Sequence, residues 1–147
     1  MPKNQFLYQY GDRLFSSAQI QEFYKLVLDK PEDHWLNIKL NCGCKIVFGV
    51  ITNSNNNTIS IKIDMRTDKE SVKTTFDKLY SLYEKESYTH ISPKIEWNRK
   101  DDEISSNIIL TNEFDIRNKD SYTDIFDWIL EYTEKFYNFF NTRIQTL

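Results

Sequence analysis

The chain has 147 residues, a length that fits one domain with one hydrophobic core and is too short for two. Hydrophobic residues make up 39% of it and aromatic residues 15%, which excludes an intrinsically disordered protein. The formal net charge is −3, so no global positive field draws the chain to nucleic acid or to an anionic membrane. No apolar run reaches the length of a membrane span and no secretory signal is recognisable, so we expect a cytoplasmic protein.

The first half of the chain predicts a helix followed by three strands. Apolar residues at three- and four-residue steps indicate a helix over residues 17–29, which ends before Pro31. Residues 36–40 alternate apolar and polar, whereas residues 45–52 are apolar on both faces, as in a central strand that is covered on both sides. An asparagine turn, whose residues tolerate left-handed conformations, precedes an alternating strand over residues 59–64. These three strands are expected to form a meander.

The second half predicts a helix, a hairpin and a long final helix. Thr67 and Glu70 form a capping box for a helix over residues 68–86. A strand from Pro93 through Trp97 and a second strand over residues 104–110 are expected to pair as a hairpin. Apolar spacing from Ser121 indicates a helix that reaches almost to Leu147. The order α-βββ-α-ββ-α predicts a single α+β domain over residues 1–147, with one mainly antiparallel sheet and helices packed on it.

The cysteines and histidines are the first candidates for a metal site. Cys42 and Cys44, with His34 and His90, have the side chains that zinc prefers. A structural zinc site normally begins with two cysteines that are two to four residues apart, and here the gap is one residue. Two histidines, no nucleophile-elbow motif and three scattered glycines also predict no catalytic triad and no phosphate loop. We therefore predict no metal and no cofactor.

A divergent metal-dependent nuclease is the alternative that the carboxylates allow. The order of elements resembles the core of restriction-endonuclease-like nucleases, which hold Mg²⁺ with two acids and orient water with a lysine. The signature of that family is missing, because the second strand has no acid and the third strand, IKID, reverses the acid-x-lysine order. Lys62 and Asp64 alternate with isoleucines, which places them on the solvated face of the sheet. Only under this alternative would the catalytic residues be Asp64, Lys62, Glu70 and Asp12, with Mg²⁺ as cofactor.

An acidic segment is the most distinctive feature of the chain. Residues 113–134 contain seven acids and two basic residues, which gives a local net charge of −5. Four of the acids fall at three- and four-residue steps along one stripe of the final helix: Asp124, Asp127, Glu131 and Glu134. A solvated helix face is the ordinary explanation, and a docking surface for a basic protein is the functional one.

The same charge argues against nucleic acid as the partner of this stripe. A phosphate that approached residues 113–134 would meet repulsion that no interleaved lysine or arginine relieves. If nucleic acid does bind, Lys39 and Lys62 are better placed, because both are predicted on the outward face of neighbouring strands.

The final helix carries more aromatic residues than one face can bury against a small sheet. Tyr122, Phe126, Tyr137 and Phe140 lie opposite or oblique to the stripe that Ile125 and Ile129 begin. Aromatic residues are enriched at protein interfaces. We therefore predict a homodimer with this flank in or near the contact.

From His34 to the C-terminus, the chain resembles a bacterial family known only as a domain of unknown function. The resemblance lies in the segment HWLNIKLNCGCKIVFGVI, in FDKL at residues 76–79, in Ile95-Glu96-Trp97, and in an aromatic final helix that closes on residues 140–147. Members of that family occur alone or at the C-terminus of restriction-endonuclease-like proteins. The resemblance implies a setting in bacterial or phage defence and DNA metabolism, and it carries no catalytic assignment.

We therefore predict a non-enzymatic binding or accessory module that acts through protein contacts. The prediction rests on the absence of catalytic motifs and on the acidic stripe. The metal-dependent nuclease remains the alternative.

Overall fold

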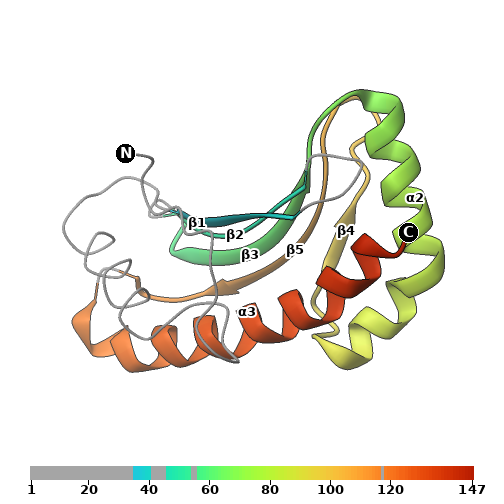
Figure 1. The fold of residues 1–147 in the computed structure, drawn as a ribbon. Helices are drawn as coiled ribbons and strands as arrows, with labels where there is room; N and C mark the ends of the chain where they lie inside the picture. Colours follow the sequence, from blue (N-terminus) through green and yellow to red (C-terminus); the bar gives the residue numbers. More distant parts are fainter. Residues whose placement is uncertain (1–34, 41–45, 54–55, 117) are drawn as a thin grey trace.

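A computed structural model describes residues 35–40, 46–53, 56–116 and 118–147. Over these residues the fold is α+β, as the sequence predicts (Figure 1). The elements, in chain order, are β1 (Trp35–Leu40), β2 (Ile46–Asn53), β3 (Thr58–Met65), α2 (Lys69–His90), β4 (Glu96–Asn98), β5 (Ser106–Glu113), the 3-10 helix η1 (Lys119–Ser121) and α3 (Tyr122–Gln145). The helix expected over residues 17–29 lies outside the described residues, as do His34, Cys42 and Cys44.

The five strands form one antiparallel sheet in the order β1-β2-β3-β5-β4. This order confirms the predicted meander and its union with the hairpin in one sheet. Strand β5 pairs with β3 along all eight of its residues, whereas β4 pairs with β5 over three residues only. Asn57 has φ = 53°, which confirms that the asparagine turn uses a left-handed conformation.

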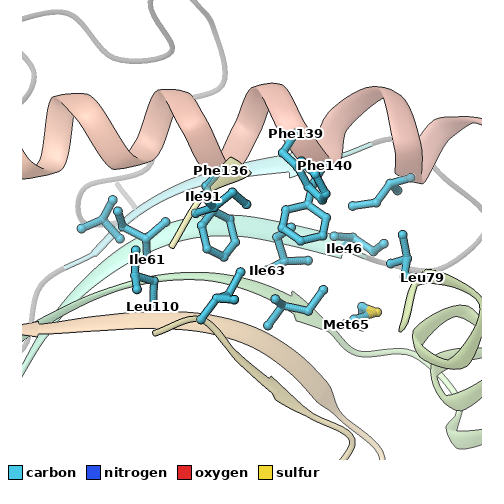
Figure 2. Packing of buried hydrophobic residues seen from close by; sticks show 14 of the residues in the cluster. Ile46, Ile61, Ile63, Met65, Leu79, Ile91, Leu110, Phe136, Phe139 and Phe140 are labelled. Carbon is cyan, nitrogen blue, oxygen red and sulfur yellow. The ribbon is translucent and has the colours of Figure 1, made fainter. Parts of the chain in front are cut away.

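Both helices pack on the same face of the sheet and share one hydrophobic core. The isoleucines of β3 alternate with polar residues, and Ile59, Ile61 and Ile63 are fully buried. Phe136 and Phe140 extend from α3 toward these strands, where they meet Ile61, Ile63 and Leu110 (Figure 2). Helix α2 adds its own apolar stripe to this core at Val72, Phe76 and Leu79.

Residues 45–52 were predicted to be covered on both faces of the sheet, and the described side chains show full burial on the helix face. Ile46 and Val50 are buried under the helices, and Ile51, on the other face, is half-buried. The side chains of residues 47–49 lie outside the description.

Helix α2 differs from its prediction at both ends. The N-cap is Asp68 and not Thr67, because the Asp68 carboxylate accepts a hydrogen bond of 2.9 Å from the N–H of Ser71. This bond also lowers the pKa of Asp68. The helix continues to His90, four residues past the predicted end. Its apolar period is interrupted there by Ser87, which is nevertheless buried and accepts a hydrogen bond of 3.1 Å from the indole of Trp97.

The predicted hairpin is correct in kind but shifted along the chain. Strand β4 covers residues 96–98, and β5 begins at Ser106, two residues later than expected, with Ile104 52% exposed. Strand β5 then runs on to Glu113, because its last residues pair with β3 as far as Thr58. These last residues, TNE, are polar and give no apolar alternation in the sequence.

Candidate binding groove

Among the described residues, one edge of β5 has no neighbouring strand beyond Ile109, which pairs with the first residue of β4, Glu96. The N–H of Phe114 donates to the carbonyl of Asn57 at 2.9 Å, so Phe114 faces β3 with its backbone groups. In an antiparallel pair, successive residues direct these groups to opposite sides. Even-numbered residues of β5 therefore bond to β3, and odd-numbered residues face β4. Ile109 and Asn107 meet β4, whereas the N–H and C=O of Thr111 face an opening.

The chain before β4 turns away just where it could have paired with Thr111. Continuing the register that sets Glu96 opposite Ile109 would place Lys94 opposite Thr111. The N–H of Lys94 instead donates to the hydroxyl of Ser92 at 3.1 Å, and the N–H of Ile95 donates to the carbonyl of Ser92 at 3.2 Å. Because of this tight turn, β4 begins only at Glu96 and leaves the edge of β5 at Thr111 uncovered.

The opening is a groove of about 290 Å³ between the turn, β5 and α3. It lies close to the lower end of the volumes typical of ligand pockets. Its lining comes from the three elements just described and comprises Ser92, Pro93, Lys94, Leu110, Thr111, Asn112, Trp128 and Tyr132.

Aromatic side chains of α3 form one wall of the groove. Trp128 and Tyr132 are half-buried and lie one turn apart, with ring centroids separated by 5.5 Å. Phe114 meets Trp128 edge-on at 5.6 Å, and this contact fixes the end of β5 against the helix. The ammonium of Lys135 lies 4.9 Å from the centre of the Tyr132 ring, so this wall already holds a cation.

The acidic stripe borders this aromatic wall. Asp124, Asp127 and Glu131 are exposed on α3, and they stand four residues before, one residue before and three residues after Trp128. On a helix these positions surround the tryptophan on its solvent side.

Two details of the predicted stripe need correction. Glu134 is half-buried, so only three of the four acids are exposed. The negative charge expected along the stripe is reduced at Glu131, because Lys135 lies just beyond the acidic segment and its ammonium bonds to the Glu131 carboxylate at 2.9 Å. The same bond raises the pKa of Lys135. The stripe keeps an excess of negative charge at Asp124 and Asp127.

The structure does not gather the nuclease residues into a described site. Asp64 is 3.6 Å from the guanidinium of Arg66, Lys62 is half-buried on the sheet face away from the helices, and Glu70 is exposed in the first turn of α2. Asp12 lies outside the described residues. Over the described part of the chain, no group of three or more histidine, cysteine or acidic side chains could hold a metal ion.

The sheet also separates the two lysines suggested for nucleic acid. Lys39 lies on β1 and Lys62 on β3, with β2 between them, so they are not on neighbouring strands. In register, Lys39 pairs with Val47, and Lys62 pairs with Gly49. The predicted meander itself requires this separation, because residues 45–52 form its middle strand.

One of the aromatic residues predicted to lie at the dimer contact, Phe140, belongs to the hydrophobic core instead. Phe140 is fully buried, with its ring centroid 5.7 Å from that of Trp97 and 5.2 Å from that of Phe136. Phe126 and Tyr137 are half-buried and pack against the core, and the side chain of Tyr122 is not described. A helical wheel misplaces Phe140 because the core wraps around α3 from both the sheet and α2.

Sequence reasoning missed the groove because backbone groups form much of it. Ser92-Pro93 is the one signal that could have indicated the opening, since a serine before a proline favours a turn. We expected Pro93 to begin the strand. Trp97, which the resemblance singled out beside Glu96, has a packing role, because its ring contacts Phe76 at 5.9 Å and Tyr80 at 5.6 Å.

The chain belongs to a family that is described as a domain of unknown function, DUF4268, whose model matches residues 3–144. The predicted membership in an uncharacterised family is thereby confirmed. No curated protein and no solved structure matches this chain. Among the described residues, neither helix is long and apolar enough to cross a lipid bilayer.

Proposed function

We propose that this domain is a non-enzymatic binding module that takes a basic protein segment at the groove between β5 and α3. The observation that carries the proposal is the meeting of an open strand edge, an aromatic wall and exposed carboxylates in one place. Each of these features favours a polypeptide with positive side chains. The carboxylates attract them, and the rings of Trp128 and Tyr132 can receive a cation as Tyr132 already receives Lys135.

The binding residues in this proposal are the exposed acids Asp124, Asp127 and Glu131, with Glu134 at the margin of the stripe. Opposite charges across an interface accelerate association more than they slow dissociation. The stripe therefore acts as the steering part of the surface, while the groove beside it holds the segment.

The experiment uses two labelled synthetic peptides of equal length, one alternating lysine with valine and the other alternating glutamate with valine. The whole chain should bind the lysine peptide and not the glutamate peptide, and the affinity should fall as salt rises. The triple variant Asp124→Asn, Asp127→Asn, Glu131→Gln should lower the association rate by about tenfold. If the lysine peptide does not bind, or if a DNA duplex of the same length binds better, the proposal is wrong.

A matched control removes the same charge elsewhere. Glu70, Asp102 and Glu103 are exposed, and they lie on the first turn of α2 and in the β4–β5 turn, beyond the other end of β5. The variant Glu70→Gln, Asp102→Asn, Glu103→Gln should bind the lysine peptide at the wild-type rate. Equal loss in both triple variants would assign the effect to net charge alone and remove the stripe from the site.

The setting of this module is also part of the proposal. The resemblance from His34 to the C-terminus supports a bacterial or phage protein of the cytoplasm, which works beside defence or DNA-processing machinery. Self-association is proposed with Phe126 and Tyr137 near the contact. A sedimentation measurement that gives a monomer at tens of micromolar would contradict it.

A further inference from the structure

We propose that the bound segment is extended and adds a short strand to the sheet by pairing with the backbone of Thr111. This inference rests on the proposed function and specifies how the basic segment is held. The N–H and C=O of Thr111 face the groove, and no described residue bonds to either group. An exposed strand edge of this kind is a template for another strand.

The site is limited to one residue of β5, which defines its hydrogen bonds. Beyond Thr111, the next outward N–H belongs to Glu113, and it is already taken by the side chain of Asn112 at 3.0 Å. On the other side, Ile109 pairs with Glu96 of β4. The added segment therefore exchanges two hydrogen bonds with Thr111, as a hydrogen-bonded pair does in an antiparallel ladder.

The pleat of the new strand assigns its side chains to two faces. The residue opposite Thr111 shares the face of Thr111, which points away from the helices and whose hydroxyl is already bonded to Ser60 at 2.7 Å. The residues before and after it point to the helix side, where Trp128 and Tyr132 line the groove. Those two flanking positions are therefore the ones that select long basic side chains, because the exposed acids of α3 lie just beyond the rings.

Charge distinguishes this occupant from a nucleic acid strand. Lys94 is the one charged residue among the described residues that line the groove, and its ammonium can donate to a carbonyl of the added segment but can accept no hydrogen bond. Beside the aromatic wall, Asp124, Asp127 and Glu131 are exposed on α3. The carbonyls of a polypeptide can accept from Lys94, and its basic side chains can pair with the acids of α3. A phosphate backbone would be repelled by those acids.

The test removes one N–H from the sheet edge. Thr111→Pro deletes the outward N–H at a position where proline is tolerated, because this edge is not bonded to another strand. Thr111→Val keeps the N–H and removes only the hydroxyl. With the alternating lysine–valine peptide, Thr111→Pro should weaken binding by about tenfold or more, since two hydrogen bonds are lost or distorted, and Thr111→Val should bind as the wild type does.

A second measurement does not depend on how Thr111→Pro folds. A capped Lys-Val-Lys peptide, which has only one register with a lysine on each side of the residue opposite Thr111, is N-methylated at successive single positions and tested on the wild-type chain. One position should abolish binding and its two neighbours should have little effect, since only alternate N–H groups of an added strand face β5. Binding that survives N-methylation at every position would overturn strand pairing. If the unmethylated peptide still needs the acidic stripe in that case, the proposed function stands and only this inference fails.

Discussion

The two ends of β5 differ in how their polar groups are satisfied. At its first residue, Ser106, the hydroxyl donates to the carbonyl of Arg99 at 2.6 Å and accepts from the ammonium of Lys73 at 2.9 Å. Toward its last residues, the backbone groups of Thr111 face a groove. We call the Ser106 end of β5 the closed end, because its hydroxyl is bonded within the protein, and the Thr111 end the open end.

The closed end is built around a buried lysine. Lys73 of α2 is 6% exposed, and its ammonium also bonds to the carbonyls of Arg99, Lys100 and Ser105 at 2.5–2.9 Å. These bonds hold the β4–β5 turn, in which Lys100 has the left-handed φ of 56°. Burial, followed by repulsion from Arg99, lowers the pKa of Lys73.

Under the proposed function, the closed end of β5 serves stability and the open end serves recognition. Buried acceptors at the closed end would be costly without Lys73, so removing this residue should damage folding. At the open end, water can satisfy the backbone groups of Thr111, and under the proposed function a bound segment replaces that water. Substitutions at the closed end should therefore change stability, and substitutions at the open end should change binding.

The largest effect is expected from Phe140→Ala in the aromatic core behind the closed end. The side chain is fully buried against Trp97 and Phe136, so its loss should lower the free energy of unfolding by about 3–5 kcal/mol. Urea unfolding measures the change. Leu82→Ala, at a residue that is 60% exposed on α2, is the control and should change the stability by less than about 0.5 kcal/mol. If Phe140→Ala changed the free energy of unfolding only slightly, Phe140 would belong to the predicted dimer contact and not to the core.

The next effect is expected from Lys73→Met, which keeps most of the side-chain volume and removes the ammonium. Three carbonyls and the Ser106 hydroxyl lose their shared donor, and the free energy of unfolding should fall by about 3 kcal/mol. Lys78→Met, at an exposed position of α2, is the matched control. Affinity of the folded variant for the lysine–valine peptide should stay at the wild-type value. A variant that unfolds normally but no longer binds would break the division between the two ends.

The period of the apolar residues and the short connections between elements made most of the fold predictable. Alternation at Ile59, Ile61 and Ile63 gave a strand with the correct buried face, and short connections gave the antiparallel order. The cap of α2 was misplaced by one residue because Thr67 and Asp68 are both good N-caps, and only the geometry of the Ser71 N–H distinguishes them.

The candidate site was less predictable, for a physical reason. The acidic stripe is visible in the sequence, since side-chain charge follows the helical period. The opening at Thr111 depends on the backbone direction of one residue, which side-chain chemistry does not determine. It also depends on the turn at Ser92, which the Ser92-Pro93 pair favours without showing that the turn lies against β5. The burial of Lys73 was equally unpredictable, because a lysine on a helix is normally exposed to solvent. Only the folded chain brings its four oxygen partners together.

The smallest effect is a pH dependence at Tyr88 in the last turns of α2. A hydrogen bond to Glu84, with burial second, raises the pKa of Tyr88 from 10.0 to about 12. The unfolded chain releases this proton at lower pH than the folded chain, so the tyrosine's contribution to stability is complete below pH 10 and is lost as the pH rises to about 12. The lowered pKa of Lys73 acts in the opposite direction, because the cost of burying its charge is relieved as the pH rises. The comparison with Tyr88→Phe isolates the tyrosine, since Lys73 is common to both chains. Urea midpoints measured from pH 9 upward should fall more steeply for the wild type than for Tyr88→Phe between about pH 10 and pH 12, and parallel curves would show that the Glu84 bond does not form in solution.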